Sequence, residues 1–486
     1  MMENLNLNLK KLSILIFICL FFYYPLITAN VYYRDDLDRV ISGYYGWSSM
    51  GRPLADFVSQ FLSNWTALSI DVFPLNLFLS CLFLAFSSYV ICNKILDKYK
   101  INNSLILSSI ILINPLFIQN MLYRFDSTSM SLAILFAALA YCVEFKSVAI
   151  TYISKILLSV VSLSLYQPCY NLFMGLIALE IICATIKNNN VKNIFIITAK
   201  GGFYFLLSYI IYMITVAKIY VTSSRAEIIK PNEDGIKQII KTNENLIGII
   251  NTYVDTIGIN QIIFLSIAFF ISLILSSIKR NDVIKKISFI LLSTLIIYVS
   301  FLGPTMVLKD APVMARGIVT IPVLFMISLL FICEVNRKFK IINYIIIIIV
   351  LTPMISFSYY TGNAIKNQRE YEDNIFSMIN YDLLNKANFK IEKVMITGSL
   401  GVSPASRNIV RMKPLVSSVL SNVYGFQSSY LLTINGVKNV EPAYGKDNVY
   451  RELIKESMKD SENIISQNEK YSIYKNNSDV IIKLGM

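Results

Sequence analysis

Histidine is absent from this 486-residue sequence, and charged residues make up only 15% of it. The lack of histidine excludes His-based catalytic triads, His-ligated metal sites and His proton shuttles. Any acid or base chemistry must therefore come from Asp, Glu, Lys or Tyr side chains. The sequence also lacks a P-loop and a GxGxxG fingerprint, so the short turn at 398–401 is given no nucleotide-binding role.

Cysteine is scarce too, and no CxxC pair is present. Each cysteine lies in or beside an apolar run, which is typical of small buried hydrophobic residues and not of disulfides or metal ligands. The seven positions are Cys19, Cys81, Cys92, Cys142, Cys169, Cys183 and Cys333.

Apolar residues are abundant, at 55% of the chain, and they gather in runs long enough to cross about 30 Å of hydrocarbon. These runs predict a mainly α, polytopic membrane helix bundle of about eleven spans. The predicted spans are 11–29, 71–92, 103–120, 129–144, 150–167, 169–186, 201–220, 259–278, 286–303, 317–334 and 341–360. We therefore divide the chain into a membrane domain at 1–360 and a small C-terminal α/β domain at 361–486, here called the tail.

The formal charge of +13 follows from Lys and Arg that flank the apolar runs, so it does not indicate nucleic acid as a partner. Cytoplasmic loops collect such cations, and Lys10 and Lys11 precede the first span, which predicts a cytoplasmic N-terminus. Clusters at 94–100, 187–200, 279–286 and 337–340 then fall on the same side. The tail and the segment 30–70, here called the first outer loop, are predicted to be extracytoplasmic.

The segment 221–258 carries isoleucines on one helical face. This pattern predicts a helix lying on the membrane surface, and a helix packed on the tail is the other interpretation. In the tail, the sequence predicts a helix at 366–386, a strand at 393–397 and a closing hairpin around Asn476 and Asn477.

The first outer loop concentrates charge, aromatic residues and glycine in "VYYRDDLDRVISGYYGWSSMGRP" at 31–53. Asp35 and Asp36 follow the first span by about six residues. A short helix beginning near Asp35 would place both carboxylates at its N-terminus, where the helix dipole favours their ionised form. An ionised carboxylate can act as a general base or a metal ligand. Pro53 is expected at the first position of a second helix.

Three further outer span ends carry polar residues. Arg124 and Asp126 lie in "MLYRFDSTSM", and Gln167 follows Tyr166 at the end of another span. Lys309 and Arg316 lie in "LGPTMVLKDAPVMARGI", where Arg offers a bidentate fork and Lys a mobile charge to a lipid-linked phosphate. Snorkelling to the membrane interface is the alternative role for these two cations.

The arrangement "RDDLDR...GYYGWSSMGRPLADF", followed by "YRFDSTSM" and "LSLYQP", resembles the bacterial type-II O-antigen glucosyltransferases, the Gtr or serotype-converting family. The resemblance implies a GT-C-like architecture with an active site at the outer face and a polyprenyl-phosphate sugar as donor. It further implies transfer of glucose, or a related sugar, from undecaprenyl phosphate to a lipid-linked polysaccharide such as the O-antigen of lipopolysaccharide.

An acceptor hydroxyl needs a base as it attacks the anomeric carbon, and a carboxylate is the available type. We expect Asp35 first and Asp36 second in this role, with inversion if the displacement is single. A divalent metal (Mg or Mn) held by Asp35, Asp36 and Asp126 is left open. The other candidate substrate-binding residues are Arg34, Arg39, Trp47, Arg52, Arg124, Asp126, Gln167, Lys309 and Arg316.

Other function classes remain open at this point. One is a flippase or transporter of polyprenyl-linked sugars, although the spans carry few of the mid-membrane ionisable residues that ion-coupled transporters use. Another is a polysaccharide polymerase or ligase, for which a large central loop would be expected to carry the chemistry. A third is a membrane anchor that displays the tail, for which eleven spans are more than needed.

Overall fold

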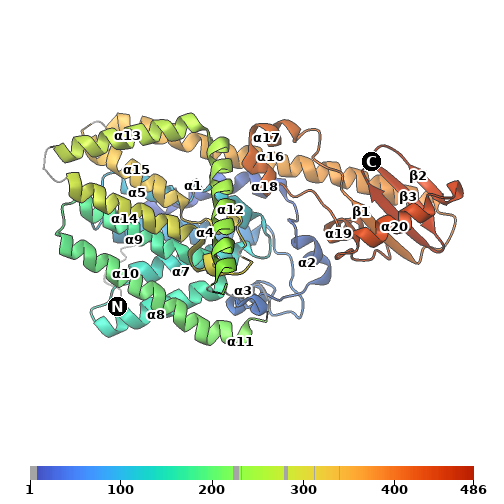
Figure 1. Cartoon of the computed structure of the whole chain (residues 1–486), viewed down its shortest axis with the longest axis horizontal. Helices are drawn as coiled ribbons and strands as arrows, with labels where there is room; N and C mark the ends of the chain where they lie inside the picture. Colours follow the sequence, from blue (N-terminus) through green and yellow to red (C-terminus); the bar gives the residue numbers. More distant parts are fainter. Residues whose placement is uncertain are drawn as a thin grey trace.

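The structure is a computed structural model that describes residues 8–222, 229–230, 232–278, 283–310, 312–338 and 340–485. A helical bundle forms one end of the elongated molecule and the tail forms the other (Figure 1). The predicted cationic cluster at 279–286 lies partly outside the described residues, because Lys279 and Arg280 are among those not described.

The bundle consists of apolar helices, and seven of the described helices are long and apolar enough to cross a membrane, or eight if one bent pair is a single span. This confirms a mainly α, polytopic membrane fold. The bundle helices are α1 (Leu9–Ala29), α4 (Leu75–Ile91), α7 (Ser127–Cys142), α8 (Val148–Leu165), α9 (Leu172–Ile186), α10 (Val191–Tyr212), α13 (Ile259–Ile278), α14 (Val283–Leu302), α15 (Ile321–Val335) and α16 (Lys340–Lys386). Of these, α7 and α15 are shorter apolar helices.

The predicted span at 103–120 is not a continuous helix. The chain forms α5 (Ser104–Ser109), leaves helical structure, and resumes with a 3-10 turn at Pro115–Phe117 and α6 (Ile118–Leu122). The physical reason is Pro115, which has no N–H to donate and disfavours helical backbone at the preceding Asn114. Asn114 is extended instead, and its side chain accepts a hydrogen bond from Leu116 N.

The helix α12 (Glu233–Ile257) runs crosswise to the bundle at the end that faces the tail (Figure 1). It meets α13 at an angle of 95°, at Gly258, whose φ is 109°. Ile236, Ile240 and Ile247 are exposed on α12, which fits the predicted surface helix. Its last turn also contacts the tail, because Leu415 N donates to Thr256 Oγ1 at 2.8 Å. Both sequence interpretations therefore describe part of α12.

The tail is a small α/β unit whose four-stranded sheet has the order β1-β4-β3-β2. The parallel pair β1–β4 joins residues far apart in sequence, while β3 and β4 form the predicted hairpin, with Asn477 in the left-handed region at φ 57°. The predicted strand at 393–397 is confirmed as β1, and the predicted helix at 366–386 as the outer part of α16. The strands are β1 (Lys393–Gly398), β2 (Ile464–Gln467), β3 (Tyr471–Asn476) and β4 (Asp479–Leu484); the helices are α17 (Arg407–Met412), α18 (Pro414–Val419), α19 (Phe426–Ile434) and α20 (Asp447–Ser457).

The first outer loop is structured, as predicted. It contains α2 (Asp36–Ser42), the 3-10 turn η1 (Ser48–Met50) and α3 (Pro53–Leu62), with Pro53 at the start of α3. The side chain of Leu37 on α2 lies in the hydrophobic core of the tail, together with Phe376 and Leu432.

The remaining short elements are η2 (Cys92–Leu96), η4 (Gln167–Asn171), η5 (Met213–Ala217), α11 (Lys218–Tyr220), η7 (Gly303–Val307), η8 (Ala315–Gly317) and η9 (Ser461–Asn463).

Candidate functional site

Two buried charged residues fix the start of the first outer loop to the bundle. Asp36 is 1% exposed, and its Oδ2 accepts hydrogen bonds from Tyr33 N at 3.2 Å and Arg124 N at 2.9 Å. The guanidinium of Arg124 donates to Val31 O at 3.0 Å, to Asp71 Oδ2 at 2.7 Å and to Asn30 Oδ1 at 2.5 Å. All three of its nitrogens are therefore engaged. Arg124 therefore joins the ends of these segments, and its role in substrate binding stays a prediction.

The turn before α3 is held by Asp56, a residue the sequence did not single out. Its carboxylate accepts from the backbone N–H groups of Gly46 at 2.9 Å, Trp47 at 3.1 Å and Ser48 at 2.6 Å, and also from the hydroxyl of Ser48. Three converging N–H groups would otherwise be unsatisfied, since this turn is not part of a regular helix or sheet. Asp56 thereby fixes the position of the Trp47 side chain.

Trp47 links the first outer loop to Asp126 on the next outer segment. Its indole Nε1 donates to Asp126 Oδ1 at 2.5 Å, and Arg39 Nη1 lies 3.4 Å from Asp126 Oδ2. The guanidinium of Arg39 also stacks over the Trp47 ring, 3.8 Å from its centre, in cation–π geometry. The three candidate residues thus form one buried cluster, in which Arg39 and Trp47 orient the Asp126 carboxylate.

Asp35 lies beside this cluster. It is exposed to solvent, whereas the neighbouring Asp36 is buried. Partial desolvation by the surrounding protein atoms raises the pKa of Asp35, and the negative charge of Asp126 raises it further. The positive charges of Arg316, Arg39 and Arg34 lower it. Burial likewise raises the pKa of Asp36, to about 8. Desolvation therefore opposes the effect of the helix dipole at both carboxylates, and most strongly at Asp36. A raised pKa makes an accessible carboxylate a stronger base.

Arg52 and Gln167 also belong to the site, since the charges of Asp126 and Arg316 act on Arg52. Arg52 Nε donates to Gln167 Oε1 at 2.8 Å, and its guanidinium lies 4.5 Å from the centre of the Tyr166 ring. Gln167 Nε2 in turn donates to Met50 O at 2.9 Å. Burial lowers the pKa of Arg52, Tyr166 raises it, and the like charge of nearby Arg316 lowers it further. Arg still keeps its charge at neutral pH. Two neighbouring guanidinium groups of this kind favour an anion between or beside them.

Arg316 reaches the same region from η8. Its backbone N–H donates to Gln119 Oε1 at 3.2 Å, and its guanidinium lies 5.0 Å from the centre of the Tyr123 ring. Within the described part of the chain, that guanidinium makes no hydrogen bond or ion pair with another residue. Unlike Arg124, Arg316 therefore has its donors available for a ligand.

Two other predicted residues lie at the edge of this arrangement. Arg34 has left-handed backbone at φ 48°, and its Nη2 lies 3.5 Å from Ser418 O on the tail. Lys309 is exposed in the turn that follows η7, and it takes no part in the contacts described above. The structure thus brings together Asp35, Asp126, Arg39, Trp47, Arg52, Gln167 and Arg316.

The described residues offer no group of three or more Asp, Glu, His or Cys side chains placed to hold a metal ion. The proposed set of Asp35, Asp36 and Asp126 does not converge, because Asp36 is directed at backbone N–H groups and Asp126 at Trp47 and Arg39. The donor set therefore does not fit a divalent cation, and we route no chemistry through one.

The tail contributes contacts that the sequence did not predict. Tyr33 donates from its hydroxyl to Val419 O at 2.7 Å, Arg369 Nη2 donates to Tyr32 O at 3.0 Å, and Tyr444 donates to Asp38 Oδ2. Asp56 and Tyr444 were not singled out from the sequence, whereas Tyr166 was noted beside Gln167 at a span end. Asp56 and Tyr444 carried no local signal in the sequence and acquire their contacts through folding.

The fold and site define a polytopic membrane protein with an exposed carboxylate, Asp35, and an unengaged guanidinium, Arg316, at the end of its bundle that faces the tail. Residues 24–333 match the family described as "Glucosyl transferase GtrII", and the chain belongs to that family of membrane glycosyltransferases. It is also 28% identical over 424 residues to a Salmonella phage P22 protein described as an uncharacterized 55.3 kDa protein in the gtrB 5' region. That match covers 85% of this chain and 86% of the phage protein.

Proposed function

We propose that this glycosyltransferase moves a glucosyl or related residue from a polyprenyl-phosphate donor to a lipid-linked O-antigen or similar surface polysaccharide. The observation that carries the proposal is the pairing of an accessible carboxylate of raised pKa, Asp35, with the unengaged guanidinium of Arg316. The reaction takes place on the extracytoplasmic side, where nucleotide sugars are scarce and a lipid-borne donor is the available kind.

In the proposed mechanism, Asp35 accepts the proton of the acceptor hydroxyl as the hydroxyl oxygen attacks the anomeric carbon. The bond from that carbon to the phosphate oxygen breaks, and polyprenyl phosphate leaves. The transition state is oxocarbenium-like, and negative charge grows on the departing phosphate. Arg316 and Arg52 stabilise that charge by fixed positive charge. A single displacement of this kind inverts the anomeric configuration.

The neighbours of Asp35 support its role as base. Asp126 keeps a negative charge close by, which favours proton uptake by Asp35, and Trp47 and Arg39 hold Asp126 in place. A carboxylate whose pKa approaches the working pH accepts a proton in the transition state more readily than an ordinary aspartate does.

The adjacent pair Asp35 and Asp36 supplies a matched test. Asp35→Asn removes the base, and we expect it to abolish transfer from undecaprenyl-phosphate glucose in membranes that contain normal amounts of the protein. Asp36→Asn keeps a carbonyl oxygen for the two backbone N–H donors, so we expect a folded and active protein. Full activity of Asp35→Asn, or equal loss in both variants, would remove the base assignment. Mass and linkage analysis of the surface polysaccharide with and without the protein identifies the sugar.

A further inference from the structure

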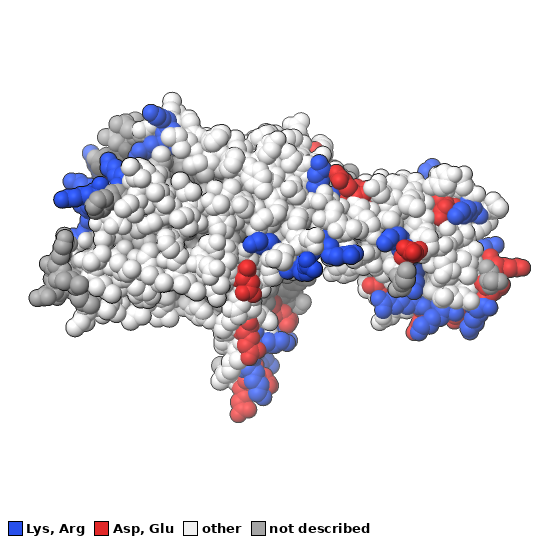
Figure 2. All heavy atoms as spheres, turned by 90° about the horizontal axis from the view of Figure 1, so that it is seen from above, with Lys and Arg blue, Asp and Glu red and all other residues white. Residues whose placement is uncertain are grey.

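The other end of the bundle, away from the tail, carries a cavity of about 850 Å³. Figure 2 shows Lys and Arg gathered at this end with few acidic residues among them. Charge asymmetry predicts this end to be cytoplasmic. The cations that line the cavity are Lys98, Lys100, Lys187, Lys286 and Arg337, and the one carboxylate among its described lining residues is Glu334.

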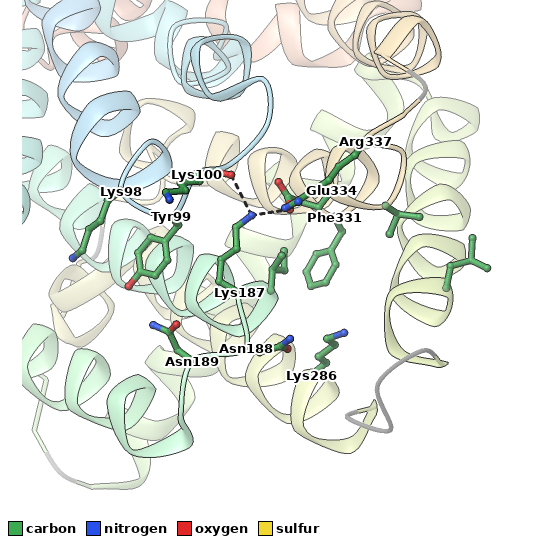
Figure 3. A pocket seen from close by; sticks show the side chains of 13 residues that line it. Lys98, Tyr99, Lys100, Lys187, Asn188, Asn189, Lys286, Phe331, Glu334 and Arg337 are labelled. Atoms are coloured by element: carbon green, nitrogen blue, oxygen red, sulfur yellow. Dashed lines mark hydrogen bonds and ion pairs between the residues drawn. The ribbon is translucent and has the colours of Figure 1, made fainter.

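Glu334 organises one wall of this basic cavity. Its side chain is 6% exposed, and Oε2 lies 3.0 Å from Lys187 Nζ and 3.2 Å from Arg337 Nε. Its other oxygen accepts from Asn102 N at 3.1 Å. Lys187 also donates to Lys100 O at 3.1 Å, so its ammonium is held in the middle of the group (Figure 3). Glu334 thus positions two of the lining cations, while Lys98 pairs with Glu180, outside the lining, at 2.9 Å.

The remaining walls combine charge with apolar surface. Lys286, on α14, is only 2% exposed yet lines the cavity. Ile186, Leu275, Phe331 and Val335 complete the lining, and Figure 3 shows Phe331 between Arg337 and Lys286.

The position of the cavity limits the ligand class. It opens where α9, α13 and α15 end and α14 begins, which is the headgroup level for helices that span a membrane. Basic pockets between membrane helices at this level suit anionic headgroups. A free phosphate would satisfy the cations but would leave the apolar lining without a partner, whereas a lipid presents a phosphate and a chain together.

We propose that this basic cavity is a binding site for a lipid-borne phosphate group, separate from the candidate active site at the opposite end of the bundle. The proposal does not depend on the proposed function. The lipid is either an anionic phospholipid or polyprenyl phosphate, since both present the same phosphate chemistry, and the test distinguishes them.

The test measures lipid binding to the full-length protein, purified and delipidated in detergent, by native mass spectrometry and thermal unfolding. Phosphatidylglycerol, polyprenyl phosphate, phosphatidylcholine and inorganic phosphate are titrated separately. We expect one of the first two to bind and raise the unfolding temperature, with phosphatidylcholine much weaker. Equal binding of phosphatidylcholine, or saturation by inorganic phosphate at the same concentrations as the lipid, would overturn the proposal.

A matched pair of variants separates this site from diffuse surface charge. Lys100→Gln with Arg337→Gln removes two lining cations, and we expect binding to weaken about tenfold or more, since charged hydrogen bonds are lost. Lys338→Gln with Lys340→Gln removes two exposed cations nearby that do not line the cavity, and should leave binding unchanged. Replacing Arg337 also removes its ion pair with Glu334. A second measurement therefore reverses the charge of exposed Lys100 alone, in Lys100→Glu, with Lys338→Glu as its control. If lipid binding weakened equally in the test and control variants, the effect would be one of general surface charge and the proposed site would be overturned.

Discussion

The hydroxyl of Tyr444, in the tail, lies 2.5 Å from Asp38 Oδ2, on α2 of the first outer loop. The Tyr444 ring stacks on Phe426 of α19 at a centroid distance of 4.7 Å. Leu37, the residue before Asp38, is buried in the tail core. The helix that follows Asp35 is therefore supported on one side by the tail, so the tail forms part of the structure that positions the candidate base.

Tyr444→Phe removes only the hydroxyl of this contact. Loss of a hydrogen bond to a mostly buried carboxylate costs about 1.5–3 kcal/mol, and here the loss falls on the packing of α2. We expect a lower kcat/KM for sugar transfer with unchanged membrane insertion. Tyr424→Phe, at an exposed tail position, is the control. Wild-type activity in Tyr444→Phe would show that α2 keeps its place without the tail contact.

Arg316→Ala should weaken use of the donor. One charged hydrogen bond to phosphate is worth about 1.5–3 kcal/mol, so we expect kcat/KM for polyprenyl-phosphate glucose to fall by roughly tenfold to a hundredfold. Arg316→Lys should recover part of the loss, because it keeps the charge but not the fork. Arg411→Ala, an exposed arginine on α17, is the control for general charge effects. If Arg316→Ala depended on the donor as the wild type does, Arg316 would have the alternative role of snorkelling to the membrane interface.

The pH dependence of transfer should report Asp35. A general base works only when deprotonated, and the pKa of Asp35 is raised by burial and by Asp126. Activity should therefore fall, as pH decreases, at a higher pH than for an ordinary aspartate of pKa about 3.9. Asp126→Asn removes the negative neighbour, which lowers the pKa of Asp35, so the acid limb of kcat/KM should move to lower pH. A limb that stays in place would mean that another group controls it.

Gly51→Ala should disturb the Arg52 side of the site. Gly51 has φ +77°, and an added Cβ would collide with the Tyr212 hydroxyl, which hydrogen-bonds to Gly51 O and to Gln167. Gly401→Ala is a close control, with φ +72° but open space around the Cβ. Both carry the left-handed backbone cost of about 1–2 kcal/mol. We expect loss of transfer activity in Gly51→Ala alone; equal effects would point to backbone strain.

Sequence reasoning found the outer loop because unusual residues gather there within a short stretch, and it found the sheet hairpin and the surface helix by their local patterns. It could not separate Asp35 from Asp36, because the difference comes from the N–H of Arg124, 88 residues away. It gave Arg124 and Arg316 similar roles for the same reason. Which guanidinium is engaged depends on Val31, Asp71 and Asn30, whose approach is set by folding.

The 47-residue helix α16 runs without interruption from the bundle into the tail (Figure 1). At 1.5 Å per residue it is about 70 Å long, more than twice the roughly 30 Å thickness of membrane hydrocarbon. Because this helix is continuous, it sets both the height of the tail above the membrane and the rotation of the tail about the helix axis. Adding a single residue between the membrane and residue 369 would turn the tail by about 100° and carry Tyr444 away from Asp38, whereas adding seven, close to two full turns, would restore the facing at a greater height. The length of this one helix therefore sets the distance between the membrane and the tail.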